Sequence, residues 1–129
     1  MSAIHRGLFG VGLVAAVLLA QASPGEAQNL GTFRWQLAPF CNVFTYSVFQ
    51  AGPGIVLSGW DDRCGASERA ASFGTVSINP DGTAGIGVTA IQPTVTGHFS
   101  IRLDLGTLSG PWSNDLGQSG TFTFLGLGP

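Results

Sequence analysis

The sequence predicts an all-β protein in which eight antiparallel strands close into an up-and-down barrel. Three observations lead to this prediction. Strand patterns recur every ten to fourteen residues from Gly31 onward, turn sequences separate them, and no stretch of helical periodicity appears after Gln28. An open sheet would leave two exposed edges, and pairing the first strand with the last removes them. A sandwich of two sheets is the alternative architecture.

The first 27 residues have the three-part layout of a secretory signal peptide, which would form an N-terminal signal helix. A positively charged start precedes an uncharged apolar run from Leu8 to Ala20, and small residues suited to cleavage end at Ala22 or Ala27. Thirteen apolar residues cover about 20 Å as a helix, less than the roughly 30 Å of a hydrocarbon core. We therefore expect an exported protein, periplasmic or extracellular, with one domain from residue 28 to 129 and no stable membrane insertion after cleavage.

The expected mature domain carries few charges. Residues 28–129 contain four Arg, no Lys and six acidic residues, which gives 4 − 6 = −2. This balance does not attract nucleic acid or an anionic membrane surface. The partner that we expect is therefore an unidentified protein or small ligand.

Alternation of apolar and polar side chains defines the strands. In the first of them Phe33, Trp35 and Leu37 point one way, and residues 94–105 alternate throughout. Near the end of the chain, Leu108, Gly110 and Trp112, and then Gly120, Phe122 and Phe124, are predicted to face inward. The expected strands are residues 31–38, 41–50, 55–61, 69–78, 83–91, 94–105, 107–113 and 119–125.

Turn chemistry predicts the register of one hairpin. Pro80 and Asp81 suit the centre of a type I turn, and Gly82 can take the left-handed position of a G1 bulge. The resulting three-residue loop pairs Asn79 with Thr83. It also places the apolar residues of both strands on one face, whereas a two-residue loop would split them.

Cys41 and Cys64 are the only cysteines. The hairpin between them turns at residues 51–54, and both cysteines are equidistant from its centre, so simple register places them opposite each other within disulfide reach. An exported protein permits this bond. A loop of about 22 residues implies roughly 3 kcal/mol of stabilisation in the chain-entropy model.

No set of residues predicts catalysis, and we expect neither enzymatic activity nor a metal or other cofactor. His98 is the single histidine of the mature domain and lies on the polar face of its strand. Metal sites need three or four convergent ligands, and a catalytic triad needs an acid that positions the histidine. Asp61 and Asp62 are adjacent in an expected strand, so their carboxylates point to opposite faces.

The most charged segment of the mature domain surrounds Cys64. It is interpreted either as a solvated, ion-paired loop at one barrel mouth or as a binding loop held by the disulfide. The candidate binding residues are Trp60, Asp61, Asp62, Arg63, Glu68 and Arg69.

Aromatic side chains are expected both inside and outside. Those predicted to lie in the core are Phe33, Trp35, Phe73, Phe99, Trp112, Phe122 and Phe124. A second group falls on both strand faces, so at least two of its members must lie outside, where an exposed patch would suggest a partner surface. This group contains Phe40, Phe44, Tyr46, Phe49 and Trp60.

Two resemblances accompany these patterns. The Trp-bearing first strand (34–37), the two cysteines and the Pro-Asp-Gly turn (80–82) resemble the Inh-type bacterial metalloprotease inhibitors over residues 31–84. That resemblance implies an exported, lipocalin-like (calycin) barrel that inhibits through a flexible N-terminal segment. Gly110-Pro111-Trp112 is similar to the Gly-x-Trp signature of lipocalins and avidins, although that signature belongs to their first strand. The whole chain also resembles small secreted bacterial proteins of uncharacterised function.

The function expected from these observations is that of a non-enzymatic, exported binding or interaction module. A periplasmic metalloprotease inhibitor is the alternative. A carrier of small ligands would require a closed apolar cavity of roughly a few hundred Å³.

Overall fold

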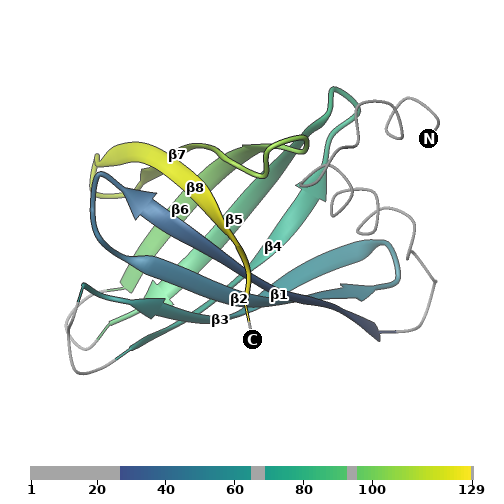
Figure 1. The fold of residues 1–129 in the computed structure, drawn as a ribbon, viewed down its shortest axis with the longest axis horizontal. Helices are drawn as coiled ribbons and strands as arrows, with labels where there is room; N and C mark the ends of the chain where they lie inside the picture. The colour runs from purple at the N-terminus through teal and green to yellow at the C-terminus, as the bar shows by residue number, and fades with distance from the viewer. Residues whose placement is uncertain (1–26, 65–68, 93–95, 129) are drawn as a thin grey trace.

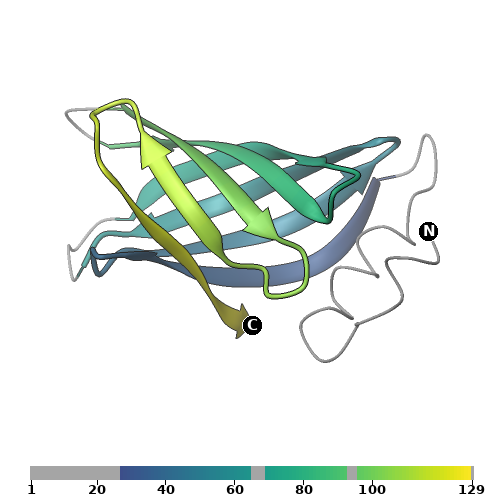
Figure 2. The same ribbon diagram turned by 90° about the horizontal axis from the view of Figure 1, so that it is seen from above.

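Eight strands, connected in chain order, form one closed antiparallel barrel (Figures 1 and 2). The structure is a computed structural model and describes residues 27–64, 69–92 and 96–128. The predicted signal helix lies outside these residues. Within them, no helix is long and apolar enough to cross a membrane. The strands are β1 (Ala27–Ala38), β2 (Val43–Ala51), β3 (Gly54–Asp62), β4 (Ala70–Ile78), β5 (Thr83–Ile91), β6 (Thr96–Asp104), β7 (Gly110–Asn114) and β8 (Ser119–Leu127).

The pairing of β1 with β8 closes the sheet. This ladder runs from the pair Phe33 and Leu127 to the pair Ala38 and Thr121. All other pairs are between neighbours in the sequence, which confirms the predicted up-and-down barrel and excludes the two-sheet sandwich. Because the sheet is closed, neither end strand presents an unpaired edge.

The barrel has two ends of different character. We call the end where β1 finishes and β2 begins the disulfide end, because it carries the Cys41–Cys64 bond; it lies on the left of Figure 1. The opposite end, here the hairpin end, carries the tight turns between β2 and β3 and between β4 and β5, together with the β6–β7 connection.

Both predicted hairpin registers are confirmed. Asn79 N donates to Thr83 O at 2.8 Å, and Gly82 has a φ of 86°, the left-handed conformation that the bulge requires. Val76 therefore faces Ile86, as expected. In the β2–β3 hairpin, Ala51 pairs with Gly54 across a two-residue turn.

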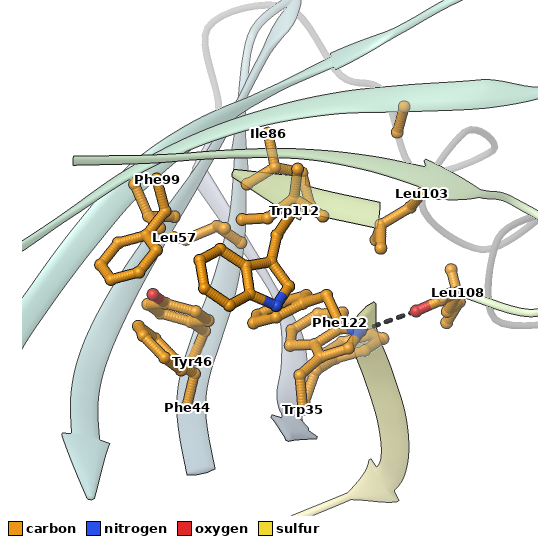
Figure 3. Close-up of a cluster of buried hydrophobic side chains, with 14 of the residues drawn as sticks. Trp35, Phe44, Tyr46, Leu57, Ile86, Phe99, Leu103, Leu108, Trp112 and Phe122 are labelled. Atoms are coloured by element: carbon orange, nitrogen blue, oxygen red, sulfur yellow. Dashed lines mark hydrogen bonds between the residues drawn. The ribbon is translucent and has the colours of Figure 1, made fainter. Parts of the chain in front are cut away.

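Large and small inward-facing side chains lie on different halves of the barrel wall. Strands β1, β2 and β6–β8 supply most of the buried aromatic rings (Figure 3), whereas several inward positions on β3–β5 carry Gly, Ala or Ser. Trp35 stacks on Phe33 and Phe122, with ring centroids 5.9 and 5.4 Å away, and its indole N–H donates to Leu108 O at 2.7 Å. Small residues on one side make room for large ones on the other, so side chains fill the interior.

Phe73 corrects one expectation, because it was predicted to lie in the core and is 49% exposed. Alternation along β4 turns Ser72 and Gly74 inward, and Phe73 between them necessarily points outward. The remaining aromatic residues predicted for the core are buried, except Phe124, which is partly buried and packs against the core.

Candidate binding site at the disulfide end of the barrel

The disulfide continues the β2–β3 ladder beyond its last pair. Val43 pairs with Asp62, and two residues further Cys41 and Cys64 are bonded, with their Cα atoms 5.1 Å apart. The predicted pairing of the two cysteines is thus confirmed. Disulfides form and persist in oxidising compartments, so this bond indicates an oxidising environment for the folded chain.

The β1–β2 loop is fastened across the mouth of the barrel at several points. The Trp112 indole N–H donates to Ala38 O at 2.8 Å, and the ring of Phe40 packs against that of Trp112 at 6.0 Å between centroids. Leu37 N donates to Asn42 O at 2.9 Å. Together with the disulfide, these contacts fix the conformation of the loop across the mouth.

Asp61 lies inside the barrel rather than at a solvated loop tip. Its side chain is fully buried, and Asn42 Nδ2 donates to both carboxylate oxygens, at 3.0 and 3.1 Å. Burial raises the pKa of this carboxyl above 3.8, and the hydrogen bond from Asn42 and the charge of Arg63 only partly oppose that effect. The ionised form therefore costs the fold free energy at neutral pH.

The replacement Asp61→Asn is expected to raise the free energy of unfolding at neutral pH by about 1 kcal/mol, because it removes a buried charge. Because the pKa is raised in the folded state, the wild-type barrel binds a proton in a pH range where the unfolded chain has already lost it. The resulting stabilisation is complete below pH 3.8 and is lost as the pH rises through the raised value. The advantage of the variant should therefore shrink as the pH falls toward 3.8, which urea unfolding at both pH values would measure.

Asp62→Asn is the matched control, because the neighbouring carboxylate points outward and is half-exposed. It should change stability little at either pH. Asp81, whose pKa is lowered chiefly by the hydrogen bond from the Thr83 hydroxyl, is the same in all three proteins, so its contribution cancels. A variant advantage at Asp61 that stayed constant with pH would contradict the argument.

The structure does not bring the predicted binding residues together at one point. Asp62 forms an ion pair with Arg69 at 3.3 Å on the outside, and the Arg69 guanidinium lies 4.6 Å from the centroid of the Trp60 ring. Asp61 faces the interior, Arg63 is half-buried, and Glu68 lies outside the described residues. The interpretation as an ion-paired surface therefore applies to Asp62 and Arg69. Asp61 is instead buried at the mouth, where it is hydrogen-bonded to Asn42.

A depression of about 240 Å³ opens at the same mouth. Its lining combines apolar side chains with four amide side chains. Its lining residues are Leu37, Phe40, Asn42, Gln92, Gly97, Phe99, Asn114, Leu116 and Gln118. As a candidate for a partner surface the sequence analysis named only Phe40 among them, because the others come from separate loops and strand ends, and uncharged amides in turns carry no motif.

Two other hollows are poorer candidates for a ligand site. The cavity at the hairpin end has a volume of about 20 Å³ and an entirely apolar lining, which is room for a water molecule but not for a ligand. A shallow groove of about 310 Å³ lies on the outside between β6 and β7, and its one charged residue, Arg102, already pairs with Asp81 at 3.1 Å. The mouth depression is the hollow where several polar groups converge on an apolar floor.

His98 does not belong to a metal-binding cluster within the described ranges. Its exposed ring shares a hydrogen bond with Thr89 Oγ1 at 3.1 Å, and its backbone N–H donates to Asp115 Oδ1 at 3.3 Å. In the part of the chain that the structure describes, no three His, Cys, Asp or Glu side chains gather where a metal ion could bind.

The fold and the site together define this protein as an all-β, up-and-down barrel with one disulfide and a depression at one end. Comparisons with models of known families, with curated proteins and with solved structures find no match.

Proposed function

We propose that this chain is an exported, non-enzymatic binding module whose site is the depression at the disulfide end. The observation that carries the proposal is the contrast between the two ends. The mouth offers about 240 Å³ lined by amide and apolar groups, whereas the cavity at the hairpin end offers about 20 Å³. The interior itself is filled, which argues against a carrier that encloses its ligand.

The chemistry of the mouth favours an uncharged ligand that carries amide or hydroxyl groups beside an apolar surface. The Asn114 side chain is engaged by Leu116 N, Gln118 N and Gln118 Oε1, at 3.1, 2.9 and 2.9 Å, so it shapes the loop. Among the described residues, the Gln92 amide and the Gln118 Nε2 group have no protein partner, which leaves them for a ligand. Phe40 and Leu116 supply exposed apolar contact beside them.

The volume of the depression suggests the size of the bound group. Sites for drug-sized molecules measure roughly 300–1,000 Å³. A space of about 240 Å³ suits a single sugar ring or one or two amino-acid side chains. We infer that the module binds a small protruding group of a larger partner, such as an exposed peptide segment or a sugar chain.

Metalloprotease inhibition stays the alternative prediction. An Inh-type mechanism needs a flexible N-terminal segment. Ala27 already pairs with Ala51 in the β1–β2 ladder, so an inhibitory arm would have to come from earlier residues, which lie outside the described part of the chain. No contact in the described barrel favours this function over ligand binding at the mouth.

Titration of the isotopically labelled protein with uncharged probes tests the proposed site. Suitable probes are a capped leucine dipeptide and a neutral disaccharide, with backbone amide shifts recorded by NMR. We expect shifts at Gln92, Gly97 and Leu116, and Leu116→Asp should weaken binding at least about tenfold by charging the exposed apolar part of the lining.

Ser113→Asp is the matched control, because it adds the same charge in the outer groove between β6 and β7. It should leave binding unchanged. Shifts that centre on Ser100 and Ser113, or no shift with either probe, would overturn the assignment of the mouth as the binding site.

A further inference from the structure

A contiguous apolar stripe crosses the outside of strands β2 to β5 and reaches the disulfide end, where Ile91 directly precedes Gln92 of the mouth depression. Phe73 is 49%, Ile91 48% and Val56 39% exposed, and none of them contributes to the core. We call this surface the outer stripe. Its members are Phe49, Val56, Trp60, Ala71, Phe73 and Ile91.

Strand register shows that these residues are neighbours. Trp60, Ala71 and Ile91 form one row across three strands, and Phe49 pairs directly with Val56. Phe73 occupies the row between them, opposite Ser58, so it is a diagonal neighbour of both Trp60 and Val56. Direct and diagonal partners on one sheet face are close enough for large side chains to touch, so the stripe is continuous.

Two glycines on β5 lie beside the stripe without a structural reason for being glycine. Gly85 and Gly87 face outward, and a Cβ atom at either position would meet nothing within 4 Å. Neither position has a positive φ, and the register of β5 is regular on both sides. Glycine weakens a strand interior and often marks a place where another backbone approaches closely.

The wall around the stripe is almost free of charge. The outward positions of β3, β4 and β5 carry Ser, Thr, Gly, Ala and the apolar residues of the stripe, with Asp62 as the one exception. Asp62 lies at the disulfide end and is neutralised by its ion pair with Arg69, whose guanidinium lies 4.6 Å from the centroid of the Trp60 ring at that end of the stripe. Interface cores in proteins are depleted of charged residues in the same way.

We propose that the outer stripe is the contact surface between two copies of this chain, related by a two-fold axis. In such an interface each surface meets itself, so any net charge would face like charge, and every projection needs a hollow on the same surface. The uncharged wall meets the first condition. For the second, Phe73 projects beside Gly87, which lies one strand away on the next row and whose missing side chain leaves open space.

In this arrangement the Phe73 ring of each copy packs over Gly87 of the other. The closed barrel offers no sheet edge for strand addition, so association has to use side chains on the wall. Binding of an unrelated partner would require neither that this surface be neutral nor that an exposed side chain such as Phe73 stand beside an open space such as that at Gly87. This inference does not rest on the proposed ligand site, because none of the stripe residues lines the mouth depression.

Light scattering coupled to size exclusion, on the purified protein with its disulfide intact, tests the proposal. We expect a dimer whose dissociation constant lies below about 100 µM. Phe73→Glu should raise that constant at least about a hundredfold, because it places two carboxylates against each other across the axis. Thr123→Glu is the matched control, since it adds the same charge to the exposed face of β8, opposite β4 in the barrel, and the dimer should survive.

Gly87→Val separates association from folding. A β-branched side chain in open space on a strand should leave the monomer at least as stable as the wild type, whereas it fills the space that the proposed interface gives to Phe73. We therefore expect a well-folded monomer. A wild-type protein that stays monomeric at about 100 µM, or a dimer that persists in both Phe73→Glu and Gly87→Val, would overturn the proposal. Capture of a different protein by a monomeric chain would do so as well.

Discussion

Gly59→Ala should destabilise the barrel by about 3 to 5 kcal/mol, a loss large enough to unfold a marginally stable domain. A Cβ atom at this position would lie 1.8 Å from the carbonyl oxygen of Thr45 on the neighbouring strand. That neighbour is backbone, which cannot rotate aside. Urea unfolding followed by tryptophan fluorescence measures the change.

The same glycine makes room for a hydrogen bond across three strands. Tyr46, Gly59 and Ser72 form one inward row, and the Tyr46 hydroxyl reaches the Ser72 hydroxyl at 2.6 Å over the missing side chain. Burial raises the pKa of the Tyr46 hydroxyl, so it stays protonated, and either of the two hydroxyls can be the donor of this bond. Alanine at position 59 would push the strands apart and leave two buried hydroxyls without partners.

Gly87→Ala is the control for this prediction. It makes the same chemical change in a β-strand, at a position where the new methyl group meets nothing within 4 Å. We expect stability to be unchanged or raised by about 0.5 kcal/mol, because alanine restricts the unfolded chain. Both variants should be measured at one low protein concentration, so that association does not contribute. Equal stability of the two variants would contradict the close approach of β2 and β3.

The registers of the two hairpins could be predicted because the residues of the turn and the alternation of apolar side chains along the strands specify the same pairing. The Pro-Asp-Gly turn required Asn79 opposite Thr83, and the same pairing placed the apolar residues of β4 and β5 on one face. The symmetry of the cysteines about the β2–β3 turn predicted their bond for the same reason. Phe73 was misplaced because aromatic character was given more weight than the alternation of its own strand.

The candidate site was only partly predictable, for a physical reason. The disulfide, the ion pair and their position at one end of the barrel could be predicted, because the residues involved lie in one hairpin or close to its end. The mouth depression instead joins Phe40, Gln92 and Leu116, which come from three different connections, and of these only Phe40 carried a signal in the sequence. The burial of Asp61 likewise depends on where β3 ends relative to the barrel mouth, which alternation alone does not determine.

Trp112→Ala should cost about 3 to 5 kcal/mol, as truncation of a fully packed indole does. Its ring contacts Phe40 and Phe99 at 6.0 and 5.7 Å between centroids, and its N–H donates to Ala38 O. Because two of these contacts hold the β1–β2 loop, the mouth should lose its shape together with the stability. Chemical denaturation measures the first effect, and backbone amide shifts at residues 40–42 measure the second.

A pair of milder variants distinguishes loss of core from loss of the loop. Trp112→Phe and Trp35→Phe each keep an aromatic ring and remove one indole N–H that donates to a backbone carbonyl, that of Ala38 or Leu108. Each should cost about 1 to 3 kcal/mol. Only Trp112→Phe should alter the amide shifts of the β1–β2 loop and weaken binding at the mouth, because Trp35 bonds to the connection at the hairpin end. If both variants disturbed the mouth equally, the loop would depend on general core packing rather than on the bond from Trp112.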